Sequence, residues 1–521
     1  MFGYAVGRND GNGPIQGMPQ AVKPRPHAPF CHVFDLDGRP VVYDVHTNGL
    51  VEVEPVLAAV LPLYGPWTRR QIVAELSPRF GAVAVRAAFA AIERGRSERG
   101  LFLARRPRLV PPPAATAAAG ACDRDLQHLV LTVTERCNLR CRYCLHDADL
   151  DWVRGHGECN MPVATALAAV AYFLDRARPN EPPVISFYGG EALLEPELIR
   201  AVVAAARAHP RGAAVQFSID SNGVLLDDRI IDLAVRERMF LQVSLDGPAS
   251  EHDRHRVDAG GRPTHARIEA GLDRLLSRDP SAADRLSLMV TLAPPVDVAA
   301  VAAYCADFPP FRRHGITRRP RLRVSRADLR GHDWPATRQE HQALAATLAA
   351  EENRFLEAMA AGSRHEAGPV ASALCESVLI RWHHRDRSPL GRARVPGGNC
   401  RPGRRKLHVM PDGSLHPCER TGDVMPIGSV ATGIEPVRVR KLQKDFHGAA
   451  SNRCAQCWAV RGCALCFASQ ASCSDGPESP TVPAQLCEAH RRSREQQLML
   501  VARSLQMPPG LRLWLDATTV T

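Results

Sequence analysis

Three cysteines of this 521-residue chain, Cys137, Cys141 and Cys144, stand within one short stretch, separated by three and then two residues. This spacing lets a single loop bring three thiolates onto three irons of a 4Fe–4S cluster, so that the fourth iron has no protein ligand. An iron with an open coordination position can bind a substrate or a cofactor. Structural zinc takes four closed ligands, commonly from paired C-x2-C units, so the spacing favours the iron–sulfur cluster over a zinc knuckle.

A second group of cysteines lies near the carboxyl end, where eight of the 16 cysteines fall between residues 400 and 487. Disulfides do not need such short-range clustering, whereas thiolates that converge on metal centres do. Two zinc ribbons would also use C-x2-C pairs, so zinc remains an alternative for this group. Four isolated cysteines are expected to be small buried apolar residues: Cys31, Cys122, Cys159 and Cys305.

Apolar strands alternate with amphipathic helices through the middle of the chain. This pattern indicates right-handed β–α–β units around a parallel sheet. Six strands are too few for a closed eight-stranded barrel, so we expect an α/β fold with an open (β/α)6 partial barrel. The expected strands are residues 129–134, 184–188, 215–219, 241–245, 286–292 and 322–325, and the main helices are residues 163–174, 196–206, 229–235 and 268–276.

Segments with other patterns flank this barrel. Two alternating runs around Asp37-Gly38 predict a hairpin within residues 32–44, followed by helices at residues 54–63, 68–76 and 83–94 and a returning strand at 101–103. The expected organisation is a flexible N-terminus at 1–27, a small α+β domain at 28–105, a linker at 106–126, the barrel at 127–335, a helical bridge at 336–395, a cysteine-rich domain at 396–491, and a C-terminal helix and tail at 492–521.

The composition excludes several classes of protein. An apolar fraction of 45% with 23% charged residues is ordinary for a globular chain and excludes disorder. No apolar run is long enough to span a membrane, and the first residues lack the apolar core of a secretory signal. The net charge of +11 is spread along the chain without basic–aromatic interleaving, which argues against nucleic-acid binding. We therefore expect a soluble cytoplasmic protein with no membrane partner.

The cysteine loop and the next strand end carry a family resemblance. The CxxxCxxC spacing after the first strand, followed by Gly189-Gly190-Glu191 at the end of the second, resembles the radical S-adenosylmethionine (SAM) superfamily. The resemblance implies that the open iron chelates SAM and that an electron, from a donor such as flavodoxin or ferredoxin, cleaves it to a 5′-deoxyadenosyl radical. It also implies that Gly189, Gly190 and Glu191 hold the SAM amino group, since glycines allow close backbone approach and a carboxylate suits an ammonium.

Polar residues at the following strand ends match further positions of that family. By resemblance, Asn222, Ser244 and Asp246 lie near the ribose and carboxylate of SAM, Arg256 is the candidate for the SAM carboxylate, and Tyr143 lies beside adenine. All follow the carboxyl ends of expected strands, where α/β barrels place their active sites. Each residue alone is a weak signal, because a Ser-Asn-Gly sequence is usually only a turn.

The C-terminal cysteines resemble the SPASM extension of radical SAM peptide and protein maturases, which binds two auxiliary 4Fe–4S clusters and would bring the total to three. By resemblance, the outer cluster is held by Cys454, Cys457, Cys463 and Cys487, and the inner one by Cys400, Cys418 and Cys466. Only two residues separate Cys463 from Cys466, where the family has three, so Cys473 rivals Cys466. Closure of the inner cluster by Cys375 or Cys473 and an open position for a substrate thiolate both remain alternatives.

The N-terminal segment decides between substrate classes. Its hairpin and three helices resemble the winged-helix-like element with which precursor-peptide maturases hold a leader peptide, which would bind by adding a strand to a sheet edge. A packing extension without function is the alternative. The resemblance therefore implies a ribosomal-peptide maturase that forges a crosslink, with a thioether favoured over a carbon–carbon bond.

Two other functions remain alternatives. The first is maturation of an enzyme subunit, of the sulfatase-activating or quinoprotein type. The second is an electron-transfer protein with three clusters, which would not need the Gly-Gly-Glu element. Sulfatase activators carry an acidic residue after the cysteine that matches Cys418, which makes Glu419 a candidate catalytic base; the alternative is a solvent-facing Glu419 beside Arg420.

Overall fold

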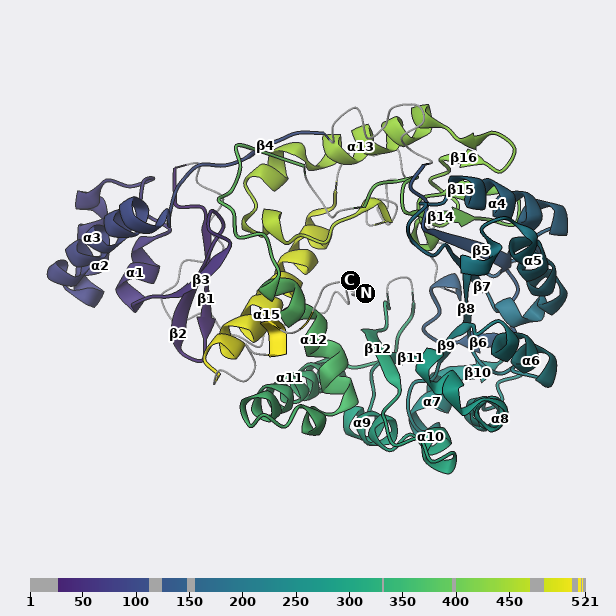
Figure 1. Cartoon of the computed structure of the whole chain (residues 1–521). Helices are drawn as coiled ribbons and strands as arrows, with labels where there is room; N and C mark the ends of the chain where they lie inside the picture. Colours follow the sequence, from purple (N-terminus) through teal and green to yellow (C-terminus); the bar gives the residue numbers. More distant parts are fainter. Residues whose placement is uncertain are drawn as a thin grey trace.

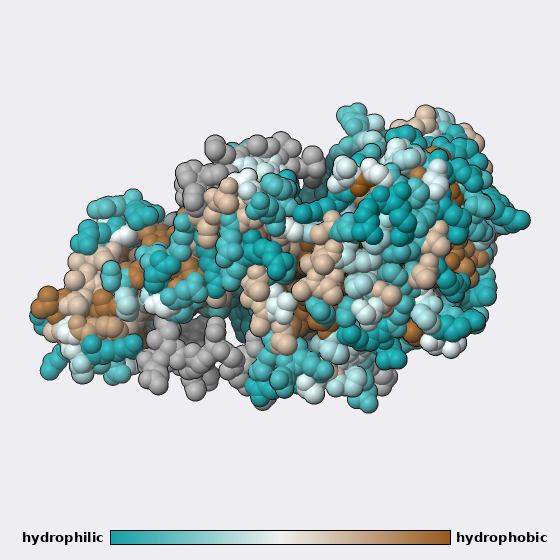
Figure 2. Space-filling model, turned by 90° about the horizontal axis from the view of Figure 1, so that it is seen from below, coloured by the Kyte–Doolittle hydropathy of each residue, from teal (hydrophilic) through white to brown (hydrophobic). Residues whose placement is uncertain are grey.

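The fold is described from a computed structural model, which covers residues 27–111, 124–147, 155–329, 332–395, 400–468, 482–507, 514–516 and 518. The chain forms an elongated molecule, with an N-terminal unit (purple) at one end and the strand–helix barrel (teal) at the other (Figure 1). Within the described residues, no helix is both long and apolar enough to cross a membrane. Figure 2 shows a largely hydrophilic surface with scattered apolar residues.

A curved sheet in the barrel positions the cysteine loop. Its strands lie in the order β12-β11-β9-β8-β7-β5-β14-β15-β16-β17, and the seven strands from β12 to β14 run parallel to their neighbours. The six expected strands are confirmed, and the sheet does not close into a ring. Their bounds are β5 (His128–Thr134), β7 (Val184–Gly189), β8 (Gln216–Ser221), β9 (Phe240–Ser244), β11 (Leu286–Leu292) and β12 (Arg321–Arg326).

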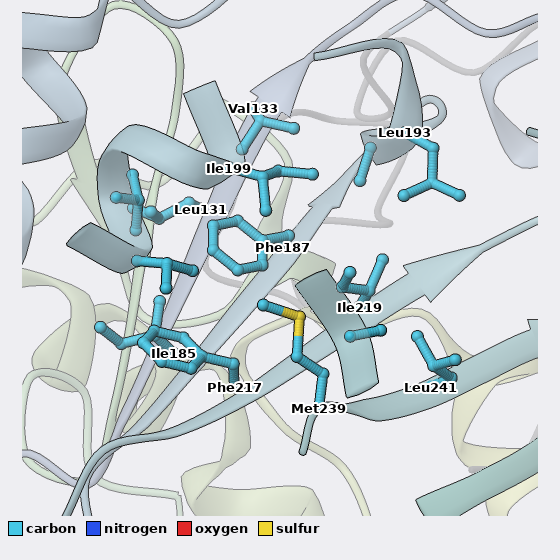
Figure 3. Packing of buried hydrophobic residues seen from close by; sticks show 14 of the residues in the cluster. Leu131, Val133, Ile185, Phe187, Leu193, Ile199, Phe217, Ile219, Met239 and Leu241 are labelled. Carbon is cyan, nitrogen blue, oxygen red and sulfur yellow. The ribbon is translucent and has the colours of Figure 1, made fainter. Parts of the chain in front are cut away.

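Helices cover the outer face of this sheet. Alternate residues of each strand point outward, and the labelled Leu131, Ile185, Phe187 and Ile219 pack there in one apolar cluster (Figure 3). Apolar residues at helical spacing bury the facing side of each helix. The helices along this part of the chain are α4 (Val163–Arg176), α5 (Pro196–Ala208), α6 (Asp228–Arg236), α7 (Ala249–His255), α8 (His265–Arg278), α9 (Val298–Ala306) and α10 (Pro309–Arg313).

The cysteine-rich region extends the same sheet, which the sequence did not predict. Strand β14 (Lys406–Val409) pairs in parallel with β5, and β15 (Ser414–His416), β16 (Gly428–Ser429) and β17 (Gly433–Ile434) continue antiparallel. Gly413, with a φ of +84°, makes the turn between β14 and β15. Strands of two to four residues carry too little periodicity to be recognised in the sequence. The barrel and the C-terminal cysteines therefore share one sheet.

The N-terminal unit contains the expected hairpin and three helices. Strands β1 (Cys31–Leu36) and β2 (Arg39–Asp44) pair around Asp37 and Gly38, which both have positive φ, and β3 (Gly49–Glu52) pairs with β2 as a third strand that was not predicted. The strand expected at residues 101–103 is wrong, because Phe102 has a φ of +58° and its backbone N–H donates to the Asp44 carboxylate over 2.7 Å. The helices are α1 (Pro55–Val60), α2 (Arg69–Phe80) and α3 (Ala82–Arg99).

The helical bridge joins this unit to the rest of the molecule. Helices α11 (Arg338–Ala360), α12 (Pro369–His383) and α15 (Ala484–Leu505) share an apolar core with residues of β1 and β2. Helix α15 begins inside the expected cysteine-rich domain and continues past its boundary at residue 491, so no structural break separates the two segments there. We conclude that one face of the N-terminal sheet is part of a core shared with the C-terminal half.

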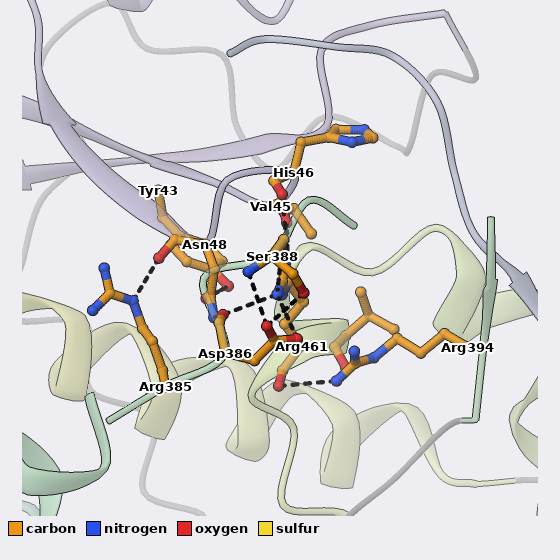
Figure 4. Close-up of polar contacts among 10 residues, drawn as sticks. Tyr43, Val45, His46, Asn48, Arg385, Asp386, Ser388, Arg394 and Arg461 are labelled. Atoms are coloured by element: carbon orange, nitrogen blue, oxygen red, sulfur yellow. Dashed lines mark hydrogen bonds and ion pairs between the residues drawn. The ribbon is translucent and has the colours of Figure 1, made fainter. Parts of the chain in front are cut away.

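A buried arginine fastens the N-terminal unit to the second cysteine group (Figure 4). Arg461 lies at the end of the short 3-10 helix η8 (Trp458–Arg461), between Cys457 and Cys463, and its side chain is only 3% exposed. Its guanidinium donates to the carbonyl oxygens of His46 at 3.1 Å and Ser388 at 3.0 Å. In the same helix, Trp458 stacks on His32 of β1 with ring centroids 3.8 Å apart. The segment between these two cysteines therefore contacts the N-terminal unit directly.

Candidate functional site

The cysteine loop leaves the carboxyl end of β5 and places Cys137, Cys141 and Cys144 together, each partly buried. Burial raises the pKa of Cys137 to about 11, and burial together with the neighbouring Cys141 and Cys137 raises the pKa of Cys144 to about 12. Metal ligation requires thiolates, so these thiols need a bound cation to lose their protons near neutral pH. Three converging soft donors of this kind fit an iron–sulfur cluster.

The strand end that follows is closely packed against this loop. A Cβ atom on Gly189 would lie 2.2 Å from the carbonyl oxygen of Thr134, and one on Gly190 would lie 2.2 Å from that of Arg136. The Gly190 N–H donates to Thr134 O over 3.0 Å, and the Glu191 N–H donates to Arg136 O over 2.8 Å. The two glycines are therefore required here by the approach of the chain's own backbone, just before Cys137, whereas the sequence argument had invoked a ligand.

Glu191 is turned into the protein. Its carboxylate is 1% exposed and accepts hydrogen bonds from the Leu193 N–H at 3.0 Å, the Ser221 hydroxyl at 2.8 Å and the Asn222 N–H at 2.7 Å. Burial raises its pKa, and these hydrogen bonds limit the rise. The carboxylate thus joins the ends of β7 and β8. Its contact with the SAM amino group stays a prediction.

Tyr143, Asp246 and Arg256 form one buried cluster beside the cysteine loop. The short strand β10 (Arg256–Asp258) pairs with β6 (Leu139–Cys141), which sets Arg256 opposite Cys141. The Arg256 Nε donates to the Asp246 carboxylate at 2.9 Å, its Nη1 lies 3.8 Å from the Cys141 sulfur, and the Tyr143 hydroxyl donates to the same carboxylate. Burial would lower the pKa of Arg256, but Asp246 reverses this and raises it, so the arginine stays charged.

The remaining two predicted SAM-site residues lie at the same edge of the sheet. The Asn222 amide donates to the Asn138 side chain at 2.8 Å, within the cysteine loop. Ser244 ends β9 and is paired with Met289 of β11. The structure therefore gathers the predicted positions around one loop, because the carboxyl ends of parallel strands meet at one edge.

Two further side chains at the loop were missed by the sequence argument. His156 Nε2 lies 3.8 Å from the Cys144 sulfur and 3.3 Å from the Asp147 carboxylate. These three residues could also hold a metal ion by themselves. Their spacing in the sequence matches no ligand motif, and only the folded loop brings them together. Cys159 nearby is exposed, so its expected burial was wrong.

The inner face of the sheet is polar, which the sequence analysis also missed. His128 contacts Ser186 at 2.6 Å, Ser186 contacts Ser218 at 2.8 Å, and Thr132 contacts His408 at 2.7 Å. Parallel strands usually bury apolar side chains on both faces, and closed barrels fill their interior with them. The signal was present as polar residues at every second position of β8, and at every second position of β5 except Val130. A polar inner face suits contact with a polar substrate.

Glu419 lies beside this polar inner face, where it contacts Lys406 of β14. Both of its carboxylate oxygens contact the Lys406 amine, at 2.9 and 3.1 Å, and its side chain is 17% exposed. Burial alone would raise the pKa of Glu419, but the lysine reverses the effect and the pKa is lowered. Glu419 therefore does not face solvent, whereas the alternative interpretation beside Arg420 required that it does. Its role as a base stays a prediction.

Four cysteines of the predicted outer cluster line one cavity. Burial, together with the neighbouring Cys463, Cys487 and Cys457, raises the pKa of Cys454 to about 12. Helix α13 (Pro436–Ala455) supplies the first of them and helix α15 the last. The cavity residues are Arg453, Cys454, Cys457, Ala459, Val460, Cys463, Leu465, Cys487, His490 and Arg491. Four thiols around one cavity fit a closed metal cluster.

The inner set contains three cysteines within the described residues. Burial, together with Glu419, Cys400 and Cys466, raises the pKa of Cys418 to about 12, which indicates that the three cysteines lie near one another. Cys375 does not join them, because it is fully buried in the apolar core shared by α11, α12 and α15. Cys473 and Cys122 lie outside the described residues.

Comparisons with known proteins identify the domain around the first cysteine loop. Residues 131–290 match the family model of the radical SAM superfamily. The chain is 27% identical to GTP 3′,8-cyclase 1 of Mycobacterium tuberculosis over 167 residues, which cover 32% of this chain and 44% of that protein. It is 25% identical to the serine-type anaerobic sulfatase-maturating enzyme of Bacteroides thetaiotaomicron over 155 residues, 29% of this chain and 37% of the relative. The chain thus spans less than half the length of either relative.

A solved structure shares the fold over more of the chain. The structure of anSMEcpe with bound AdoMet and Cp18Cys peptide superposes with a TM-score of 0.52 at 18% identity, covering 75% of this chain and 99% of that one. This likeness extends beyond the residues matched by the family model. It shows a common fold.

Proposed function

We infer that this chain, which is an enzyme of the radical SAM superfamily, is a maturase that crosslinks a ribosomally made precursor peptide. The observation that carries the proposal is the pairing of a SAM-type cysteine loop with an N-terminal unit in which β3 has no further strand beside it within the described residues. A thioether is favoured and a carbon–carbon crosslink is second. An electron donor such as flavodoxin or ferredoxin would supply the reducing electron.

The residues at the carboxyl edge of the sheet would hold the cofactors. Cys137, Cys141 and Cys144 would bind a 4Fe–4S cluster, which, with SAM, supplies a 5′-deoxyadenosyl radical that abstracts hydrogen from the substrate. Arg256, which Asp246 keeps charged and in place, would bind the SAM carboxylate. Tyr143, in the same cluster, would lie beside adenine. The backbone of Gly189 and Gly190 fixes the loop against β7.

The C-terminal cysteines would hold two auxiliary clusters. Cys454, Cys457, Cys463 and Cys487 would close the outer one. Cys400, Cys418 and Cys466 would hold the inner one with an iron left open. The burial of Cys375 in an apolar core supports this open position, which a substrate thiolate, a soft ligand, would suit.

The N-terminal unit has a groove that fits a peptide strand. Strand β1 is covered by α15, whereas β3 ends the three-stranded sheet within the described residues. A groove of about 520 Å³ runs between β3 and α3 and is lined by residues of both signs, including Arg39, Glu52 and Arg94. A leader peptide would add a strand along β3, where main-chain hydrogen bonds give affinity and the groove gives specificity.

Filling the groove should block leader binding without affecting the barrel. Ala91 lies on α3 within the groove, so Ala91→Trp is expected to weaken binding of the precursor peptide at least about tenfold, since a bulky ring occupies the path of the added strand. The neighbouring Ala90 is exposed outside the groove, and Ala90→Trp is the matched control. Isothermal titration with the precursor peptide measures both. Equal affinities of the two variants would contradict the assignment of the groove.

A sulfatase-type maturase is the second candidate function. The common fold with anSMEcpe and the carboxylate of Glu419 directly after Cys418 favour it. Such an enzyme would act on a Cys or Ser of a folding protein. It would leave the groove along β3 without a role, which is why we place it second.

A further inference from the structure

Two carboxylates lie on the polar inner face of the sheet, on different segments. Asp220 lies on β8, and Glu419 follows Cys418. Asp220 accepts a hydrogen bond from the Gln242 amide of β9, and the charges of Lys406 on β14 and Arg323 on β12 lower its pKa. Strands β12 and β14 are separated by five other strands, so charged groups on both act on Asp220 because the sheet curls around its inner face. Asp220 therefore lies on the same inner face as Ser218.

Asp220 stands at the strand end that also builds the SAM-type site. Successive residues of a strand point to opposite faces, so Ser221 reaches Glu191 on one side while Asp220 points to the other. Asn222 follows and contacts the cysteine loop. The Asp220 carboxylate is thus two residues from a contact with the cysteine loop, and the charge of Glu419, next to Cys418, acts on it from another segment.

The two carboxylates have unequal surroundings. Lys406 contacts both oxygens of Glu419, whereas no lysine or arginine nitrogen within the described residues forms an ion pair with Asp220. Burial, and after it the charge of Glu419, raise the pKa of Asp220 to about 6 against the opposing effects of Arg323, Lys406 and Gln242. Other titratable groups on this face are His128, His408, His416 and Tyr188, and burial lowers the pKa of His128 and of His416 to about 4.

A carboxylate whose two oxygens contact a lysine is held as the anion and is a poorer proton acceptor than a carboxylate without an ion-pair partner. We propose that Asp220 accepts the proton that the peptide substrate releases during crosslinking, and that Glu419 holds Lys406 in place. This assignment rests on the proposed function. It is a proton transfer only: a bond from hydrogen to a substrate heteroatom, sulfur for a thioether, breaks, an O–H bond forms on the carboxylate, and no electron moves to or from Asp220.

The test compares Asp220→Asn, Glu419→Gln and the control Asp228→Asn, which removes an exposed carboxylate of the same strand–helix unit. Crosslinked peptide and 5′-deoxyadenosine are measured separately between pH 5 and 8. Asp220→Asn should lower product formation about 100-fold, a typical contribution of a general base, while 5′-deoxyadenosine formation and iron content stay near wild type. Wild-type product formation should fall as the pH drops through about 6, where Asp220 becomes protonated.

Glu419→Gln should have a smaller effect of another kind. Removing the Glu419 charge and freeing Lys406 both favour the ionised form of Asp220, so the pH midpoint should move to lower pH. A merely structural role of Glu419 would leave the midpoint unchanged. If Asp220→Asn formed product at the wild-type rate, the role of Asp220 would be overturned, and the proposed crosslinking function would be unaffected. Loss of product only in Glu419→Gln would transfer the role to Glu419.

A second measurement separates this assignment from the proposed function. The folded-state pKa of Asp220 lies above its ordinary value, so its ionised form costs stability, and Asp220→Asn should raise Tm at pH 8. This gain should shrink as the pH falls through about 6, because the wild-type carboxyl then becomes neutral as well. A Tm gain that does not depend on pH would overturn the assignment. If the wild type crosslinks no precursor peptide, the proposed function fails and the assignment falls with it.

Discussion

Replacing Cys137, Cys141 and Cys144 together by alanine should abolish 5′-deoxyadenosine formation and leave iron in the C-terminal half. The three thiols lie in one loop beside Arg256, and the C-terminal cysteines form two other sets. After anaerobic reconstitution, the variant should contain about eight irons per chain where the wild type contains about twelve, which is the loss of one of three cubanes.

The control for this experiment is Cys159→Ala. Cys159 is exposed and close to the loop in sequence, but its backbone, not its thiol, contacts the loop: its carbonyl oxygen accepts from the Glu135 N–H at 2.8 Å. This variant should keep the iron content and the activity of the wild type. Iron content unchanged in the triple variant would contradict the assignment of the first cluster, and loss of all iron would contradict the separate C-terminal sets.

Arg256→Met should lower the stability of the protein and remove SAM binding together. The substitution leaves the Asp246 carboxylate, which is 4% exposed, buried without its cation, and breaking such a pair typically costs about 3–5 kcal/mol. The double variant Arg256→Met/Asp246→Leu removes both charges, so most of the lost stability should return. SAM binding should not return in the double variant, because the cation for the SAM carboxylate is still missing.

Tm and equilibrium binding of SAM, measured on both variants, separate the two roles of the pair. Recovery of SAM binding along with Tm in the double variant would show that Arg256 acts only through the fold. A Tm of Arg256→Met equal to that of the wild type would contradict the buried ion pair itself.

The strands of the barrel were predictable from the sequence because each is a run of five or more residues with apolar side chains at every second position. Chemistry-bearing residues such as Asn222 and Asp246 were predictable as a group because they follow such runs, and parallel strands end at one edge. The strands β14 to β17 were not predictable, because two to four residues are too few to show an alternation of apolar and polar side chains. The prediction of a strand at residues 101–103 was wrong, because the Phe102 N–H donates to the Asp44 side chain and not to a neighbouring strand.

Long-range contacts explain what else the sequence did not show. His156 reaches Cys144 only through the fold of the loop, and Arg461 meets His46 across 415 residues of sequence. The polar inner face of the sheet could have been predicted, because His128, Ser186 and Ser218 each alternate with apolar neighbours. Strands of a parallel sheet are usually apolar on both faces, so this alternation becomes clear only when neighbouring strands are compared position by position.

The shared core also changes how the N-terminal unit should be tested. Removing residues 1–105 would expose the apolar faces of α11, α12 and α15, which pack against β1 and β2. Loss of activity on deletion would therefore report unfolding as well as loss of the leader site. Substitutions within the groove avoid this ambiguity, because the groove lies on the β3 side of the sheet.

The most direct test of the account offers the reconstituted enzyme three substrates in parallel: a deuterated precursor peptide encoded beside its gene, a sulfatase-motif peptide that contains Cys or Ser, and GTP. Each reaction is followed by mass spectrometry of 5′-deoxyadenosine and of the substrate. The account predicts that only the precursor peptide stimulates 5′-deoxyadenosine formation, transfers deuterium to it, and loses hydrogen as the crosslink forms. Stimulation and deuterium transfer by the sulfatase-motif peptide or by GTP instead would contradict it.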